Sequence, residues 1–280
     1  MHWLFLYILF ALHFSQLLRL GQKRSCRTMA VVGTNYVLAG LISILAALAL
    51  GGLAAAGRSR LAILGASAGV LFVLHALIML AAFRIVGTGI TWAFVGSGVV
   101  VPVLFARFLW GEPMSPMQWT ALGLVPLAVV LMRPPKREGE TGRRAGLKGD
   151  LILLLCLLMA GAIGTLHKAQ AIYVESLPAA EAAGRLISRE RLFYQAVLFL
   201  ATVVVSVGFM AAAGLLPTRK EALIGLGVGL ANTCGLFFAL LAIGAMAASV
   251  FFPTSGCLVI VGNTLAGRVL WRERLGPRQW

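Results

Sequence analysis

Two histidine–glutamine pairs are the residues of this sequence whose types and spacing best suit the recognition of a small molecule. His13 and Gln16 lie in one apolar run, and His167 and Gln170 lie in another. A spacing of three residues places both members of a pair on one helix face. Imidazole and carboxamide groups both donate and accept hydrogen bonds. Because the pair recurs, we expect the two faces to line one polar cavity.

Further polar and aromatic side chains occur inside apolar runs, where polar groups are costly unless they face a cavity or a partner helix. Asn35, Gln195 and Thr233 belong to this set, and single interhelical hydrogen bonds are the alternative for each member. We include five more of these residues among the candidates that line the cavity, namely Tyr36, His75, Trp92, Tyr194 and Asn232.

Charged residues near the ends of the runs permit several interpretations. Glu112 and Glu273 lie near arginines, which favours ion pairing or loop structure over a proton relay. Lys168 is the only lysine within an apolar run, and it either extends to the membrane surface or binds an anionic substrate.

The cysteines form no cluster with metal-ligand spacing, so we expect no metal and no cofactor.

Two of the runs contain helix-breaking residues. Gly98 and Pro102 interrupt one, and Pro253 and Gly256 interrupt another. Broken helices at corresponding positions of two halves are typical of transport sites, because freed backbone groups can contact the substrate. A packing kink between close helices is the alternative.

These residues must be positioned by helices within a membrane. Of the 280 residues, 60% are hydrophobic and 12% are charged, which is too few charges for the surface of a soluble protein. We predict an all-α, polytopic bundle with nine spans of the length that a bilayer requires. The predicted spans are 3–18, 29–55, 61–83, 89–110, 117–132, 151–173, 192–215, 222–242 and 247–271.

A basic, Pro- and Gly-rich linker at 134–149 separates a first unit at 1–133 from a second at 150–280. Four sets of matches relate the two units in the same order. The matching features are His13/Gln16 with His167/Gln170, Arg27/Tyr36 with Arg185/Tyr194, Gly65-x-x-x-Gly69 with Gly225-x-x-x-Gly229, and Trp110–Trp119 with Trp271–Trp280.

Each complete repeat would hold five spans, and an odd number inverts the second repeat relative to the first. The repeat also predicts a tenth span after Trp280, which the sequence does not contain. Either the sequence is truncated or the protein works with nine spans. Ser115 and Gln118 fit a capping box at the start of the fifth span.

The repeated motif resembles the signature of the drug/metabolite transporter superfamily, in its ten-span EamA-like branch. Gly111, Glu112, Gln118 and Trp119 match that signature in the first half. Glu273, Gln279 and Trp280 match it in the second half, where Arg272 replaces the glycine. The resemblance implies secondary transport, often export, of small organic metabolites or drugs.

We therefore expect a secondary transporter that works by alternating access, not an enzyme. Its expected partners are a small-molecule substrate, the lipid bilayer and coupling protons, without nucleic acid; a homodimer is left open. The alternatives are an integral-membrane enzyme acting on lipid and a non-transporting, lipid-flipping subunit.

The net charge of +15 reports the orientation in the membrane. About 17 of the 24 Lys and Arg fall on the face that holds the linker, which predicts that this face is cytoplasmic and that the N-terminus is outside. The family resemblance implies the reverse orientation. The expected location is the cell membrane, with multiple spans.

Overall fold

The computed structural model describes residues 2–86, 88–131, 147–177 and 188–271. The described residues form helices joined by short connections, with a single 3-10 turn, η1. The helices are α1 (His2–Lys23), α2 (Thr28–Ala49), η1 (Gly52–Ala55), α3 (Ser59–Ile85), α4 (Thr88–Ser97), α5 (Val100–Leu109), α6 (Pro116–Leu131), α7 (Leu147–Glu175), α9 (Arg189–Ala212), α10 (Arg219–Ala245) and α11 (Ala248–Trp271).

The prediction of an all-α, polytopic membrane bundle is confirmed. Eight stretches of helix are long and apolar enough to cross a bilayer, and α4 and α5 together provide one of them. They match eight of the nine predicted spans. The remaining predicted span forms α6, of which 16 residues are described. The linker at 132–146 and the C-terminal segment 272–280, with Glu273, Gln279 and Trp280, lie outside the described residues.

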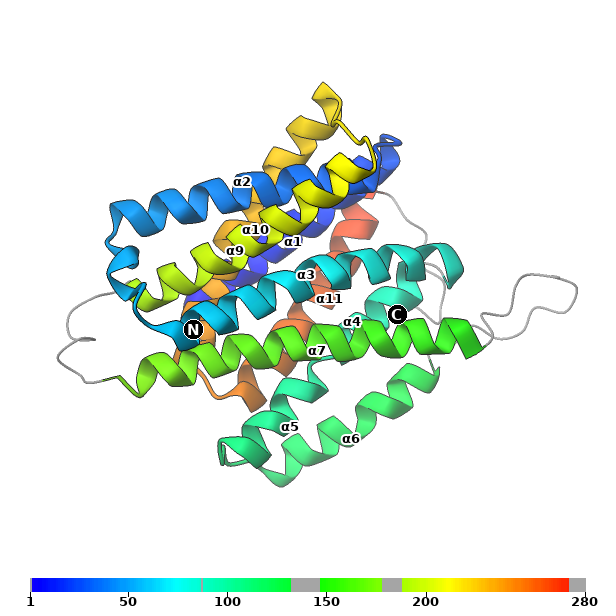
Figure 1. Ribbon diagram of the computed structural model, residues 1–280. Coiled ribbons are helices and arrows are strands. Elements are labelled where there is room, and N and C mark those ends of the chain that lie inside the picture. The colour runs from blue at the N-terminus through cyan, green and yellow to red at the C-terminus, as the bar shows by residue number, and fades with distance from the viewer. Residues whose placement is uncertain (1, 87, 132–146, 178–187, 272–280) are drawn as a thin grey trace, which may run out of the picture.

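Corresponding helices of the two halves run in opposite directions. In Figure 1, α1 runs from the end marked N toward the right, whereas α7 begins at the right and runs left; α2 and α9 are likewise antiparallel. We call the end at which α1 begins the N-terminal end of the bundle. The opposite end, at which α6 finishes and α7 begins, is the linker end.

The helix packing is also the same when the halves are exchanged. Helix α3 packs against α9 as α10 packs against α2, and α1 packs against α10 as α7 packs against α3. Helices α2 and α9 contact each other at the centre of this arrangement, and α1 lies against α11 as α7 lies against α4 and α5. The bundle therefore has the packing of two inverted repeats related by a pseudo-two-fold axis.

Glycines at equivalent positions allow the closest helix contacts. A Cβ added to Gly65 of α3 would lie 2.9 Å from the carbonyl oxygen of Tyr194, and one added to Gly225 of α10 would lie 2.9 Å from that of Val31. Gly69 and Gly229, one turn further along, meet the carbonyls of Leu198 and Asn35 in the same way. Small residues permit such backbone approach in lipid, where close packing replaces the hydrophobic driving force.

The same contacts correct one of the sequence matches. Tyr194 occupies the place of Val31, more than one helical turn from Tyr36, so Tyr36 and Tyr194 are not symmetry mates. In the register that pairs Val31 with Tyr194, Gly40 of α2 is equivalent to Val203 of α9, and these two residues contact each other directly. Equivalent residues can meet only on the pseudo-two-fold axis, so this contact supports the same register. A shared residue type in two long apolar helices was therefore not a sufficient guide to their register.

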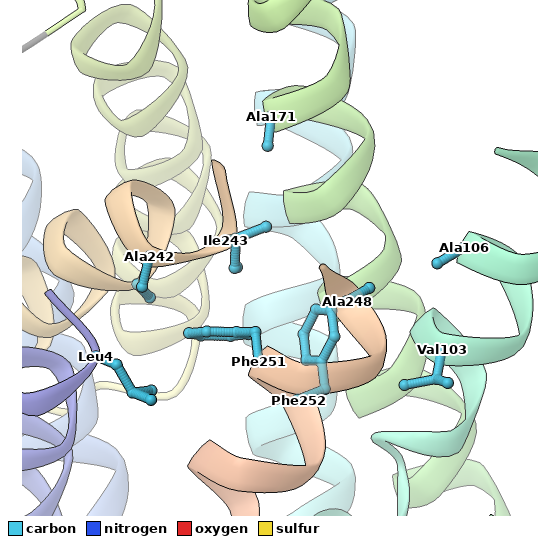
Figure 2. Packing of buried hydrophobic residues seen from close by; sticks show 10 residues of the cluster. Leu4, Val103, Ala106, Ala171, Ala242, Ile243, Ala248, Phe251 and Phe252 are labelled. Carbon is cyan, nitrogen blue, oxygen red and sulfur yellow. The ribbon is translucent and has the colours of Figure 1, made fainter. Parts of the chain in front are cut away.

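The two halves also meet in an apolar cluster near the N-terminal end. Figure 2 shows Phe251 and Phe252, from the start of α11, between Leu4 of α1 and Val103 of α5. Ala171 of α7 and Ile243 of α10 complete the contact. This cluster joins helices of both repeats and supports the charged contacts described next.

Candidate functional site

Polar side chains from both halves form a clamp at the N-terminal end. Lys168 of α7 is 4% exposed, and its Nζ lies 2.7 Å from Oε1 of Glu112 in the connection between α5 and α6. The other carboxylate oxygen of Glu112 accepts the backbone N–H of Ala248, at the start of α11, over 2.7 Å. Lys168 also donates to the carbonyl of Met246 at 3.4 Å. We call this set the Glu112–Lys168 clamp.

Local backbone geometry delivers Glu112 to this position. Gly111 ends α5 with a φ of +67°, a left-handed conformation that favours glycine, and the Glu112 N–H then bonds the carbonyl of Ala106. Ser115 and Gln118 form the predicted capping box at the start of α6, with both reciprocal bonds present. The connection is therefore built to hold one carboxylate against the opposite repeat.

The partner of Glu112 was missed from the sequence. Arg107 reaches only its backbone carbonyl, at 3.5 Å, whereas Lys168 is distant in the chain. Lys168 therefore forms a buried ion pair within the bundle. The signal that was available is that Lys168 is the only lysine within an apolar run, which is costly unless the charge is paired.

A second group of charges lies at the same end. Arg58, which directly precedes α3, pairs with Glu190 of α9, with Nε 3.7 Å from Oε1. The Arg191 guanidinium and the Glu175 carboxylate both border Gly244, near the end of α10. Charged side chains from before α3, from the end of α7 and from the start of α9 thus gather beside the end of α10 at the N-terminal surface.

The second histidine–glutamine pair is buried deeper between α7, α3 and α9. His167 is 7% exposed, its Nδ1 lies 2.8 Å from the Tyr194 hydroxyl, and its ring packs against Phe72. Gln170 is fully buried, and neither its Nε2 nor its Oε1 has a hydrogen-bond partner among the described residues. A buried amide that lacks both bonds is costly, so Gln170 is poised to bind a group that both donates and accepts.

The first pair does not share this environment, which corrects the prediction of two equivalent cavity faces. His13 is exposed and its Nδ1 lies 2.8 Å from the carbonyl of Leu9 in its own helix. Gln16 donates to Asn263 of α11 at 2.7 Å and accepts from the Trp271 indole at 2.6 Å. Gln16 therefore joins two helices, and the halves are alike in fold but not in chemistry.

The other candidates divide between packing and polar roles. Tyr36 is buried and donates to the carbonyl of Phe72 at 3.4 Å, and Asn232 donates to Asn35 at 3.1 Å across the contact between α10 and α2. His75 has a buried Nε2 without a partner among the described residues. Trp92 is 39% exposed and packs on Phe83, which gives it no observed polar role.

A small pocket lies between α2, α3 and α9, toward the linker end of the bundle. Its cavity volume is about 10 Å³, roughly the space for one water molecule. Its lining includes Tyr36, Val73, Ser206 and Met210. The hydroxyl of Ser206 is the second polar group besides Tyr36 in an otherwise apolar wall.

One of the two predicted helix breaks is present. The chain leaves the helix at Gly98, between α4 and α5, and a Cβ there would lie 2.7 Å from the carbonyl of Leu157 in α7. Pro102 lies buried in the first turn of α5. Helix α11, in contrast, continues through Pro253 and Gly256. Pro253 is only the sixth residue of α11, so it removes one backbone bond near a helix end instead of breaking the middle.

Comparisons with known proteins confirm the fold alone. No family model matches this sequence, and no curated protein matches it. Twelve chains of solved structures match. One, described only as "Crystal structure of protein", has a TM-score of 0.69 and 14% identity, over 99% of this chain and 90% of that chain. The chain therefore shares its fold with a solved structure over nearly its full length.

Proposed function

We propose that this protein is a secondary transporter of small organic molecules, which moves its substrate by alternating access between two inverted repeats. The observation that carries the proposal is the packing of the bundle, which is unchanged when the antiparallel halves are exchanged. Inverted repeats let a bundle adopt two related conformations, each open to one side of the membrane.

The Glu112–Lys168 clamp supports a gate at the N-terminal end. It joins α7 to the α5–α6 connection and to the start of α11, so it ties the first repeat to the second. The Arg58–Glu190 pair adds a contact between the residue before α3 and the start of α9 at the same surface. Opening toward this side requires the clamp to break.

Gln170, His167 and Tyr194 support a substrate contact behind this gate. The unpaired amide of Gln170 suits a neutral polar group, and the nearby charges of Lys168 and Glu112 neutralise each other. The resemblance of Gly111-Glu112 and Gln118-Trp119 to the drug/metabolite transporters favours metabolites or drugs as the substrate class, with proton coupling as the expected energy source.

Transport by reconstituted protein tests the proposal. Proteoliposomes are loaded with a panel of radiolabelled neutral and charged metabolites, and efflux is measured with and without a pH gradient. We expect efflux of at least one neutral polar compound. Gln170→Leu should lower that efflux at least tenfold while raising the melting temperature, because it removes an unsatisfied buried amide worth about 1–3 kcal/mol.

The matched control replaces Gln22, an exposed glutamine of α1, by Leu, and it should leave efflux unchanged. Equal efflux by Gln170→Leu and the wild type would remove Gln170 from the substrate path. Flipping of a fluorescent phospholipid in the same vesicles, with no efflux of any compound in the panel, would overturn the transporter proposal in favour of lipid flipping.

A further inference from the structure

Gln170 keeps both polar atoms of its amide unpaired in the interior of the bundle. It is fully buried, and neither Nε2 nor Oε1 has a hydrogen-bond partner among the described residues. Gln195 of α9 is also buried and its Oε1 is also unpaired, but its Nε2 donates to the Ser43 hydroxyl at 3.3 Å and to the Thr233 carbonyl at 3.1 Å. A buried amide without any bond has a cost that an apolar side chain of the same size would avoid. The amide of Gln170 therefore points to a ligand.

The chemistry of a primary amide defines the single group that satisfies both atoms at once. The carbonyl oxygen accepts a hydrogen bond and the N–H on the same side donates one, so the two atoms form one flat edge. A ligand forms two parallel hydrogen bonds with this edge when its own N–H and C=O lie side by side. Lactams, imides and cyclic ureas have this cis arrangement, whereas a trans peptide bond holds its N–H and C=O on opposite sides. An ionised carboxylate offers acceptors only and would leave Oε1 of Gln170 unpaired.

Aromatic rings near Gln170 favour a flat ligand. His167 lies one helical turn before Gln170 on the same face of α7. The centroid of its ring lies 5.8 Å from that of Phe72 of α3 and 5.9 Å from that of Tyr194 of α9. Three helices thus contribute rings whose faces and edges pack well against another planar ring.

The charged residue closest to Gln170 along α7 is already neutralised. Lys168 is held against Glu112 at 2.7 Å, and a charged ligand buried beside this pair would lack a partner of its own. We propose that the substrate of this transporter is a neutral, planar molecule with a cis-amide edge, which pairs with the amide of Gln170. This inference rests on the proposed function, because Gln170 is fully buried here and a ligand reaches it only when the bundle opens.

Binding of uracil to the detergent-solubilised protein, measured by isothermal titration calorimetry, tests the proposal. Uracil is neutral and planar and has N–H beside C=O, whereas 1,3-dimethyluracil has the same ring and carbonyls with both N–H groups methylated. We expect uracil to bind at least about tenfold more tightly, because the methylated ring leaves Oε1 of Gln170 unpaired. Gln170→Met keeps the size of the side chain and removes both polar atoms. It should abolish this preference without lowering the unfolding temperature.

The matched control is Gln195→Met, at the glutamine whose Nε2 is bonded to Ser43 and Thr233. It should lower the unfolding temperature and keep the preference for uracil. Equal affinity of the wild type for the two compounds, no binding of uracil, or an unchanged preference in Gln170→Met would each overturn the inference.

Efflux from proteoliposomes separates this failure from a failure of the proposed function. Efflux of a neutral compound without a cis-amide edge, unaffected by Gln170→Met, would leave the transporter proposal intact and overturn this inference. Uracil binding with the expected preference, but with no efflux of any compound, would keep the ligand class and overturn transport.

Discussion

The Glu112–Lys168 clamp is a buried ion pair whose value depends on both partners. The Lys168 side chain is 5% exposed and that of Glu112 is 16% exposed. A buried pair gains little over well-packed apolar residues, but a single buried charge without its partner is strongly destabilising. The clamp therefore constrains the conformation more than it adds to the total stability.

A double-mutant cycle measures this coupling. Lys168→Met and Glu112→Gln should each lower the free energy of unfolding by about 3 kcal/mol, because each leaves a polar group unpaired. The double variant should cost clearly less than the sum of the two, as measured by thermal unfolding in detergent. Arg107→Gln, at an exposed residue that reaches only the Glu112 carbonyl, is the control, with an expected change of less than about 0.5 kcal/mol. Additive single costs would contradict a coupled pair.

The sequence shows which polar residues lie within the membrane spans, but it does not show which of them are buried. His167 and Gln170 are buried while His13 is exposed, although the two pairs have the same spacing. The helices around them are apolar on nearly every face, so the sequence carries no periodic signal for which face is turned inward. Only the packing of neighbouring helices separates the exposed histidine from the buried one.

At the scale of the helices, two glycine contacts hold equivalent crossings. A Cβ at Gly69 would clash with the Leu198 carbonyl, and one at Gly229 would lie 2.7 Å from the Asn35 carbonyl. We expect Gly69→Ala and Gly229→Ala each to destabilise the bundle by about 1–3 kcal/mol, because backbone atoms cannot move aside as side chains do. Thermal unfolding of the purified variants in detergent measures the effect.

The control for this prediction is Gly208→Ala in α9, where an added Cβ meets no atom within 4 Å. It should be neutral or stabilising by up to about 1 kcal/mol, because alanine has the higher helix propensity. Loss of stability in all three variants alike would mean that the glycines act through the backbone and not through close packing.

The spans were predictable because lipid leaves a chain few options. Backbone groups in hydrocarbon must bond within a helix, so long apolar runs between charges define the helices with little ambiguity. The positions of helix breaks and the register between helices were harder to predict. The span breaks at Gly98, where the chain closely approaches α7, whereas α11 continues through Pro253. Both outcomes involve neighbouring helices that the local sequence does not reveal.

At the scale of the whole molecule, the two ends of the bundle differ in charge. The N-terminal end carries acid–base contacts such as Arg58–Glu190 and the clamp. The linker end has the Arg27–Glu221 ion pair and, in addition, the basic side chains of Arg19, Lys23, Arg24 and Lys220. Excess basic residues mark the cytoplasmic side of a membrane protein. Because the halves are inverted, α1–α5 and α7–α11 pack alike whichever way the bundle is turned, so the charge distribution distinguishes the two orientations.

The accessibility of single cysteines in intact cells tests this orientation of the bundle in the membrane. After Cys26, Cys156, Cys234 and Cys257 are replaced by Ala, single cysteines are introduced by Gly57→Cys at the N-terminal end and by Thr141→Cys in the linker. Gly57 is exposed with no atom within 4 Å of an added Cβ, so the first change should not disturb packing. We expect a membrane-impermeant maleimide to label Gly57→Cys in intact cells and Thr141→Cys only after the cells are opened. The reverse pattern would place the basic end outside, and the charge distribution would then have to serve another purpose.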